Sequence, residues 1–262
     1  MLFSINGIEP DVSVISLQRQ ANILEGENSG RLKSGDMVRD VIGTTYNYAF
    51  EVAPKLENVA AYDDLYETIT APVASYPITV PFGQGMLEYD AYVSSVNDEL
   101  TYMGSKNLWD KLLFTAMAIS PQRYAGGTWT MGTGSGNGVF SINDVEFNAS
   151  VTKLERKGEV LETSRKQSKS GVISREVLGT IYNYSMQIEQ NIDNVVEYDR
   201  LYYALTAPVN SMAIKVPYGQ GTLSFQAYVT EVRDSLIFVS DKLRRWGQLE
   251  IDFMAMQPKR RA

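Results

Sequence analysis

Hydrophobic and polar residues alternate along several segments of the chain, which is the pattern of strands with one buried face. The clearest segment is 37–52, where Tyr46, Tyr48, Phe50 and Val52 fall on one face. Residues 12–24 are also predicted to be extended, with Val12, Val14 and Leu17 on one side. Further strands are expected at 3–8, at 78–80, at 87–93 and over 108–119.

The period changes between residues 58 and 70. Val59, Tyr62, Leu65, Tyr66 and Ile69 recur at helical spacing and predict a helix with one apolar stripe. Asn58 is expected to be its N-cap, and Pro72 to end it. A second helix is expected after Asn194, which precedes Glu197 by three residues in a capping-box pattern, and before Pro208.

One stretch of sequence occurs twice. TAPVASYPITVPFGQG spans residues 70–85 and TAPVNSMAIKVPYGQG spans residues 206–221. Aligning 43–93 on 179–229 gives identity at about half of the positions, which is typical of an internal repeat. Phe3 then aligns with Phe140, and Trp109 aligns with Trp246 after a shift of one residue. Glycine supplies positive φ in turns, so the repeated Gly-Gln-Gly predicts a hairpin turn.

The repeat predicts two homologous domains, at 1–124 and 139–262, joined by a Gly/Ser/Thr-rich linker at 125–138. The glycines of the linker lack the Gly-Lys-[Ser/Thr] ending of a phosphate-binding loop, so we favour a linker. The fold class is mainly β (α+β). Each domain is expected to be an antiparallel β-sandwich or open barrel with one flanking helix and a long hairpin arm.

Composition narrows the possible chemistry. The 262 residues include no cysteine and no histidine, and the net charge is −7. Disulfides, thiolate or histidine metal sites and Ser-His-Asp triads are therefore excluded within this chain. Sequence-specific DNA binding is disfavoured by the acidic balance, and no cofactor is expected. The N-terminus lacks the pattern of a signal peptide and no segment has the length of a membrane span, so we expect a soluble protein made in a cytoplasm, without membrane partners.

Repeated polar residues are the other candidates for chemistry. Asp63 recurs as Asp199, but a single carboxylate without a partner rarely catalyses a reaction, so a solvated position is favoured. Repeated amides can bind sugar hydroxyls or satisfy turns and strand edges, and we favour the structural role. These amides are Asn47, Asn183, Gln84 and Gln220. A glycoside hydrolase needs two carboxylates at a defined separation, and no such repeated pair is visible.

Two charged segments are predicted to be long, mobile hairpin arms. The first arm, Glu25–Asp36, contains Arg31 and Lys33. The second arm, Glu162–Gly171, contains Arg165, Lys166 and Lys169. Nucleic-acid contact and a simple solvated loop are alternatives. We favour docking of these basic residues onto an acidic face of another subunit, with charge guiding the register.

The order of these elements carries a resemblance. A strand, a charged arm, the Gly-Thr-x-Tyr-Asn-Tyr strand, a short helix, Thr-Ala-Pro-Val, the Val-Pro-[Phe/Tyr]-Gly-Gln-Gly hairpin and a Trp-containing strand follow one another in both halves. This order resembles small tail proteins of phages and prophages from Gram-positive gut bacteria, and the wider tail-tube and distal-tail fold. The resemblance covers nearly the whole chain except the linker and leaves tail tube and tail-tip ring open.

The resemblance implies a non-enzymatic structural protein of the virion tail, assembled in the cytoplasm of a host bacterium. Related proteins form rings of six equivalent domains around the DNA channel, so three tandem chains would close a pseudo-six-fold ring, with a hexamer as the other possibility. By the same resemblance, the arms reach the next ring or other tail proteins, and DNA passes through the lumen without sequence-specific binding. The alternative hypothesis is a non-catalytic adaptor that binds carbohydrate on the host surface.

Overall fold

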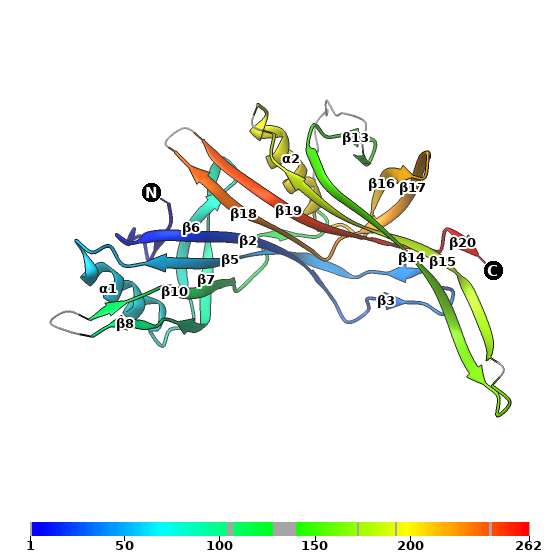
Figure 1. Ribbon diagram of the computed structural model, residues 1–262, viewed down its shortest axis with the longest axis horizontal. Coiled ribbons are helices and arrows are strands. Elements are labelled where there is room, and N and C mark those ends of the chain that lie inside the picture. The colour runs from blue at the N-terminus through cyan, green and yellow to red at the C-terminus, as the bar shows by residue number, and fades with distance from the viewer. Residues whose placement is uncertain are drawn as a thin grey trace. The chain divides into compact units, whose positions relative to one another are not determined.

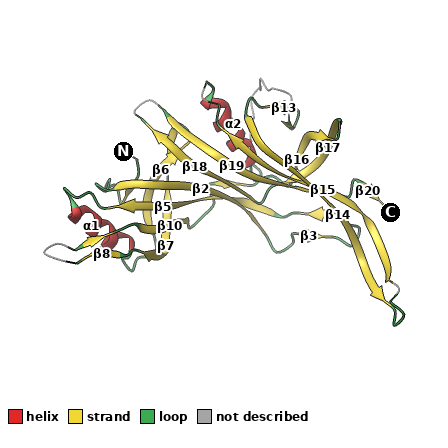
Figure 2. Ribbon diagram, viewed as in Figure 1, coloured by secondary structure: helices red, strands yellow, loops and turns green. Residues whose placement is uncertain are grey.

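A computed structural model describes residues 2–103, 107–127, 140–171, 173–191, 193–240 and 243–261 (Figure 1). These residues form a mainly β protein with antiparallel strand pairs and two helices, as the sequence predicts (Figure 2). No helix in these ranges is long and apolar enough to cross a membrane. Most of the predicted linker lies outside the described residues, because 128–139 are not among them.

The elements follow the chain in two similar series. The first series is β1 (Ser4–Ile5), β2 (Ser13–Glu25), β3 (Gly30–Arg31), β4 (Met37–Val38), β5 (Val41–Ala53), α1 (Val59–Ile69), β6 (Tyr76–Phe82), β7 (Gly85–Asn97), β8 (Leu100–Tyr102), β9 (Leu108–Trp109), β10 (Leu112–Ala118) and β11 (Arg123–Tyr124). The second series is β12 (Ser141–Ile142), β13 (Val145–Glu146), β14 (Ser150–Gln167), β15 (Ile173–Glu189), α2 (Val195–Leu205), β16 (Met212–Tyr218), β17 (Gly221–Tyr228), β18 (Glu231–Val239), β19 (Arg244–Ala255) and β20 (Arg260–Arg261).

The chain divides into two compact units, and each draws segments from both halves. Unit 1 comprises Met1–Asn22, Thr45–Gln122 and Arg233–Gly247. Unit 2 comprises Ile23–Thr44, Arg123–Val232 and Gln248–Ala262. Most of each sequence repeat therefore lies in one unit, but residues 23–44 and 233–247 belong to the unit formed mainly by the other repeat. The predicted domain limits, the homology of the two domains and their sandwich or barrel form stay predictions.

Unit 1 is built around β5. The strands of this unit follow the order β1-β6-β7-β10-β5-β2-β18. Tyr46, Tyr48, Phe50 and Val52 are each at most 2% exposed, which confirms the buried face predicted for this segment. The ring of Phe50 stacks on Phe114 of β10 at a centroid distance of 4.7 Å. The Tyr48 hydroxyl donates a hydrogen bond of 2.7 Å to the carbonyl of Pro81, so its polar atom is satisfied inside the core.

Unit 2 repeats these contacts around β15, which pairs with β14, β19 and β20. The Tyr184 hydroxyl donates to the carbonyl of Pro217 at 3.1 Å, as Tyr48 does to Pro81. The side-chain oxygen of Asn183 accepts a hydrogen bond of 2.9 Å from the N–H of Ala255. Asn47 accepts the corresponding bond from Ala118 at 3.0 Å in unit 1. The structural role favoured for these two asparagines is therefore confirmed.

The helices begin at the predicted positions, but only one is capped as expected. The side chain of Asn194 accepts a hydrogen bond of 3.2 Å from the N–H of Glu197, as the capping-box pattern predicts. Asn58 makes no side-chain cap bond, so that part of the prediction is wrong. The side-chain NH2 group of Asn58 instead donates a hydrogen bond of 2.9 Å to the carboxylate of Asp11.

The repeated Gly-Gln-Gly forms the predicted turn in both halves. Phe82 pairs with Gly85, and Tyr218 pairs with Gly221, which leaves two residues in each loop. The first residue of each loop, Gly83 or Gly219, has a positive φ of 55° or 59°. Glycine is needed at this position because a side chain disfavours that conformation.

The alternation in β2 differs from the prediction. Val12 is buried, but Leu17 does not continue its face, because the buried positions shift to the odd residues of the strand. Leu17, Arg19, Ala21 and Ile23 are all at most 6% exposed. An arginine thus occupies a core position between apolar residues, which requires partners for its five N–H groups.

The buried side of α2 provides a test of the packing. Leu201 is fully buried, whereas Val196 on the same helix is 61% exposed. Leu201→Ala is expected to lower the free energy of unfolding by about 2–5 kcal/mol, because it removes buried methyl groups and leaves a cavity.

Val196→Ala is the matched control and is expected to change the same free energy by less than about 0.5 kcal/mol. Urea denaturation followed by circular dichroism measures both values. Equal losses for the two variants would contradict the assigned orientation of α2.

Candidate interaction surface

The first arm folds back onto unit 2. Its strand β3 pairs with β4, which directly follows the arm, and the N–H of Leu32 donates to the carbonyl of Asp36 at 2.8 Å. The Arg31 guanidinium donates to the carbonyls of Gly35 at 2.6 Å and Ala255 at 3.1 Å. Lys33 is exposed. Arg31 is exposed as well, but its guanidinium is engaged by two carbonyls of this chain.

The turn of the first arm is held by the end of the chain. Arg261 donates to the carbonyl of Ser34 at 3.3 Å and to the carboxylate of Asp36 at 2.8 Å. The Ser34 hydroxyl also donates to Asp36 at 2.8 Å. The hydroxyl and then the Arg261 guanidinium lower the pKa of Asp36, because both favour the ionised carboxylate.

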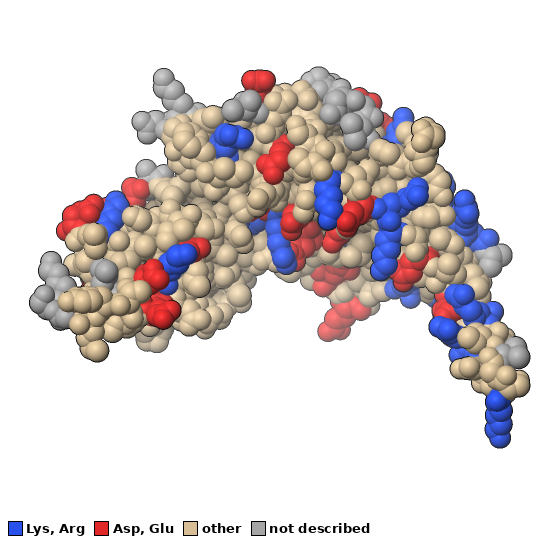
Figure 3. Space-filling model, viewed as in Figure 1, with Lys and Arg blue, Asp and Glu red and all other residues tan. Residues whose placement is uncertain are grey.

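The second arm is a two-stranded ribbon that continues β14 and β15. Figure 1 shows this ribbon extending past the ends of the other strands of unit 2. Arg165, Lys166 and Lys169 are exposed, and Figure 3 shows Lys and Arg gathered along the ribbon. Arg165 lies directly opposite Arg175, a like-charge pair that destabilises a ribbon in isolation. These three predicted residues therefore lie together near the tip of one ribbon, of which Arg31 is not a part.

Three buried arginines are absent from the sequence-based candidates. Arg19 donates from Nε and Nη2 to the two carboxylate oxygens of Asp234, at 3.0 and 2.5 Å. Its guanidinium lies 4.0 Å from the ring centroid of Trp246. The indole N–H of Trp246 in turn donates to the carbonyl of Gly83 at 3.1 Å. Arg19 and Asp234 are 1% and 2% exposed, so the pair is strong and almost fully desolvated.

Arg39 forms the second contact between the first and the second half of the chain. It donates to Glu25 at 2.8 Å and stacks on Tyr228 at 4.7 Å from the ring centroid. Its remaining N–H groups donate to the carbonyls of Val209, Asn210 and Val229 at 3.2–3.3 Å. Residues just after the first arm are thereby fixed on the loop after α2 and the end of β17.

Arg123 forms the third contact. Its Nη1 donates to the carbonyl of Tyr203 and to the hydroxyl of Thr206, both at 2.8 Å. The guanidinium lies 3.8 Å from the centroid of the Tyr203 ring. Thr44, which pairs with Arg123 across β5 and β11, donates its hydroxyl to the carbonyl of Thr206 at 2.8 Å. All three arginines thus join a residue of the first half to residues of the second half.

One signal in the sequence could have indicated Arg19. It stands in phase with Leu17, Ala21 and Ile23 on a strand, and a charge in a row of core positions is typical of a buried pair. Arg123 is surrounded by turn and polar residues, and Arg39 precedes Asp40 between two short apolar pairs, so neither stands in a comparable row of core positions.

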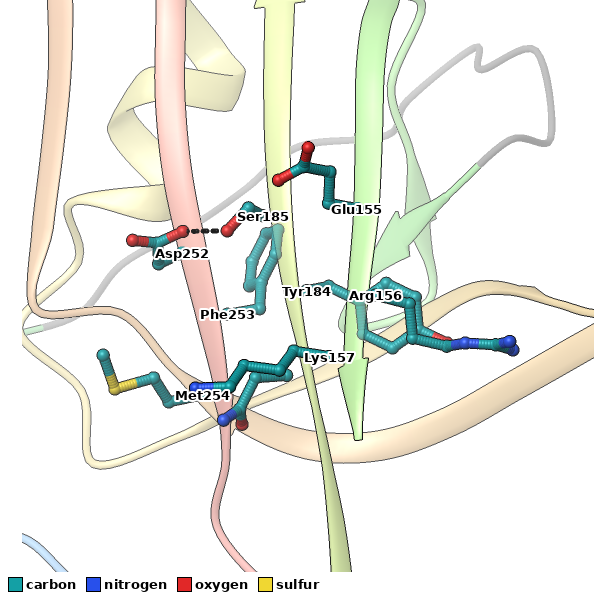
Figure 4. Close-up of a pocket in the computed structure, with 9 residues that line it drawn as sticks. Glu155, Arg156, Lys157, Tyr184, Ser185, Asp252, Phe253 and Met254 are labelled. Carbon is teal, nitrogen blue, oxygen red and sulfur yellow. Dashed lines mark hydrogen bonds between the residues drawn. The ribbon is translucent and has the colours of Figure 1, made fainter. Parts of the chain in front are cut away.

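A shallow hollow lies over β14, β15 and β19 in unit 2 (Figure 4). Its lining includes Glu155, Arg156, Lys157, Ser185 and Asp252. The Ser185 hydroxyl donates to Asp252, and the side chain of Arg156 points away from this pair (Figure 4). Among the described residues, no group of three or more acidic side chains is placed to hold a metal ion.

The other candidates have local roles. Asp63 is exposed on α1, in agreement with the solvated position expected for it, whereas Asp199 is half-buried. Gln84 donates to the carbonyl of Arg244 at 2.8 Å and accepts from its N–H at 3.0 Å, which fixes the start of β19 in unit 1. Gln220 is exposed.

No protein-family model matches the sequence, and no curated protein is similar to it at a significant level.

The buried pair in unit 1 can be tested against an equivalent surface arginine. Arg19→Met leaves Asp234 desolvated without its cation, so the free energy of unfolding should fall by about 3–5 kcal/mol. Arg156 occupies the position in β14 that Arg19 occupies in β2, and it is exposed.

The same change at Arg156 should therefore cost less than about 0.5 kcal/mol. Guanidinium chloride denaturation of dilute protein measures the two variants. An Arg19→Met protein as stable as Arg156→Met would show that the Asp234 pair contributes nothing to folding.

The exposure of the second arm predicts where trypsin cuts first. Cleavage is expected after Arg165, Lys166 and Lys169, because an isolated ribbon opens more readily than a packed sheet. Arg39 and Arg123 should resist, because they are only 5% and 6% exposed. Mass spectrometry of the earliest fragments identifies the sites, and first cleavage at either buried arginine would contradict the prediction.

Proposed function

We propose that this protein is a structural component of a phage tail or a prophage-derived tail, and that it forms a ring around the DNA channel. The tandem repeat carries this proposal, because two similar sets of elements in one chain suit a ring of equivalent positions. Three chains would then supply six positions. Both the tail tube and the ring at the tail tip fit this function.

The second arm supports assembly. Arg165, Lys166 and Lys169 are exposed on a ribbon whose strands β14 and β15, at residues 162–167 and 173–177, pair only with each other among the described residues. A long exposed ribbon invites pairing with another chain, which an assembly can use. The arm is suited to contact an acidic face on a neighbouring subunit or on another tail protein.

The charge balance supports passage of DNA. The net charge of −7 gives the protein a surface that repels phosphates rather than retaining them. We propose that part of this negative charge faces the lumen, so that DNA moves through the ring without sequence-specific binding.

The assembly state tests the proposal. The molar mass of the purified chain is measured by light scattering, and the same sample is imaged by negative-stain electron microscopy. Closed rings of three chains with a central hole are the expected result, since closure satisfies every interface.

Compact particles without a hole, or a monomer at every concentration, would contradict the ring. A glycan array run on the same protein separates the carbohydrate-binding adaptor from the ring, because an adaptor binds glycans without assembling.

A further inference from the structure

The three buried arginines have counterparts in the second half of the chain. Leu17-Gln18-Arg19 aligns with Leu154-Glu155-Arg156. The guanidinium of Arg19 lies 5.0 Å from the ring centroid of Phe82, and that of Arg156 lies 4.6 Å from Tyr218, the residue aligned with Phe82. Arg19 and Arg156 are therefore equivalent in structure as well as in sequence.

The other two arginines are matched in the same way. Arg39 pairs with Glu25, and Arg175 pairs with Glu162 at the aligned positions. Arg123 lies opposite Thr44 in a strand pair, and Arg260 lies opposite Thr180. Each counterpart thus keeps the local partner that its equivalent has within its own half.

Burial separates the two sets. The side chain of Arg39 is 1% exposed and that of Arg175 is 43% exposed. Arg156 and Arg260 are also exposed, whereas Arg19 and Arg123 are buried. The first set is covered by residues of the second half, and the second set lies at the surface with the same geometry.

The residues of the second half that contact Arg19, Arg39 and Arg123 also have aligned residues in the first half. The aligned residues of the first half are more exposed. Thr206 is fully buried, but the aligned Thr70 is exposed. Tyr228 is 7% exposed, against 38% for Tyr92. Trp246 is fully buried, against a half-buried Trp109. The aligned partner of Asp234 is Asp98, which is half-buried.

The strand edges also differ between the two halves, because one copy is paired and the other is open. In unit 1, β2 has β5 on one side and β18 on the other. Its counterpart β14 pairs only with β15 among the described strands, so its other edge is open. The segment aligned with β18 is 95–103, which in the described chain pairs only with β9 and β10. The chain therefore contains two copies of each surface of the β2–β18 contact. One copy of each surface is buried in the contact within the chain, and the other copy is exposed.

We propose that a second copy of this chain docks head to tail on these unused surfaces. Residues 95–103 of one copy lie beside β14 of the next and reproduce the contact between β18 and β2. Arg156 then pairs with Asp98 beside Trp109 of the other copy. Arg175 stacks on Tyr92, and Arg260 reaches Thr70.

Charge favours this partner. Residues 45–122, which hold the receiving surface, contain ten Asp and Glu and three Lys and Arg, for a net charge of 3 − 10 = −7. Residues 163–175 contain four Lys and Arg and no acid, for a net charge of +4. Where the contact inside the chain has Tyr203 beside Arg123, the docked copy presents the exposed Glu67 to Arg260. A second copy is therefore complementary in charge as well as in strand pattern.

The proposed contact is heterologous, because the two surfaces differ, so it propagates until a ring closes or a filament grows. As a description of how subunits meet in the proposed ring, this docking mode rests on the proposed function. The residues that form the contact are identified without reference to a phage tail.

Engineered cysteines test the pairing directly, because the chain has no cysteine of its own. The N–H of Ile23 donates to the carbonyl of Thr230 at 2.9 Å, and the aligned residues are Val160 and Ser94. A protein carrying both Val160→Cys and Ser94→Cys is oxidised and separated on a denaturing gel. A ladder of cross-linked dimers, trimers and larger species is expected.

Two controls accompany the cross-link. A protein carrying Ile23→Cys and Thr230→Cys should form the same bond within one chain, with no increase in mass. Val160→Cys alone should stop at a dimer. Absence of the ladder at the highest soluble concentration, while the control within the chain cross-links, would overturn the proposal.

A charge swap gives the second measurement. Arg156→Asp should raise the dissociation constant for self-association about tenfold or more, because one buried charge pair of the interface is lost. Asp98→Arg alone should weaken association in the same way, and the two changes together should restore it. Lys215→Asp, at an exposed site outside the contact, is the matched control. Sedimentation velocity measures all four, and circular dichroism checks that each is folded.

The outcomes separate the two proposals. Rings that form without the Val160–Ser94 cross-link and without any effect of Arg156→Asp would overturn the docking mode and leave the ring intact. Cross-linked open chains that respond to the charge swap, without closed rings, would support the docking mode and contradict the ring.

Discussion

The buried pair of Arg19 and Asp234 is the interaction on which unit 1 depends. The two residues are 215 positions apart, and both carry charge in a site almost without water. Desolvation of a single charge costs several kcal/mol, so neither residue can occupy this site without the other. The ring of Trp246 lies against the guanidinium, and the indole N–H of Trp246 donates to the carbonyl of Gly83. The position of β18 beside β2 is thereby specified by one arrangement of charge, which general hydrophobic burial does not provide.

Local patterns in the sequence were sufficient for the elements that depend on neighbouring residues. The alternation in β5, the apolar stripe of α1 and the glycine turn at Gly83 each result from periodicity or from a steric requirement. The exchange of residues 23–44 and 233–247 could not be predicted in this way. Strand partners far apart in sequence are chosen by side-chain complementarity across the sheet, and a period of two leaves the partner unspecified.

The residues of the candidate surface also differ in whether the local sequence predicts their surroundings. Arg165, Lys166 and Lys169 were recognisable because a run of basic and small polar residues has nothing to bury. Arg31 has the same local character, yet its guanidinium is bound to Gly35 and Ala255. Whether a surface arginine is engaged depends on a carbonyl more than two hundred residues away, and the sequence gives no sign of that contact. Arg39 and Arg123 escaped notice for the same reason.

The separation of 215 residues between Arg19 and Asp234 also sets an order of events during synthesis. Ribosomes add about 5–20 residues per second, so roughly 10–40 s pass between the emergence of the two residues. For that interval the nascent first half holds an uncovered arginine, and the edge of β2 lacks its neighbour. Crowded polysomes would allow this edge to meet the same edge on adjacent nascent chains. Translation speed and chaperone access therefore influence how much of this protein reaches its native pairing.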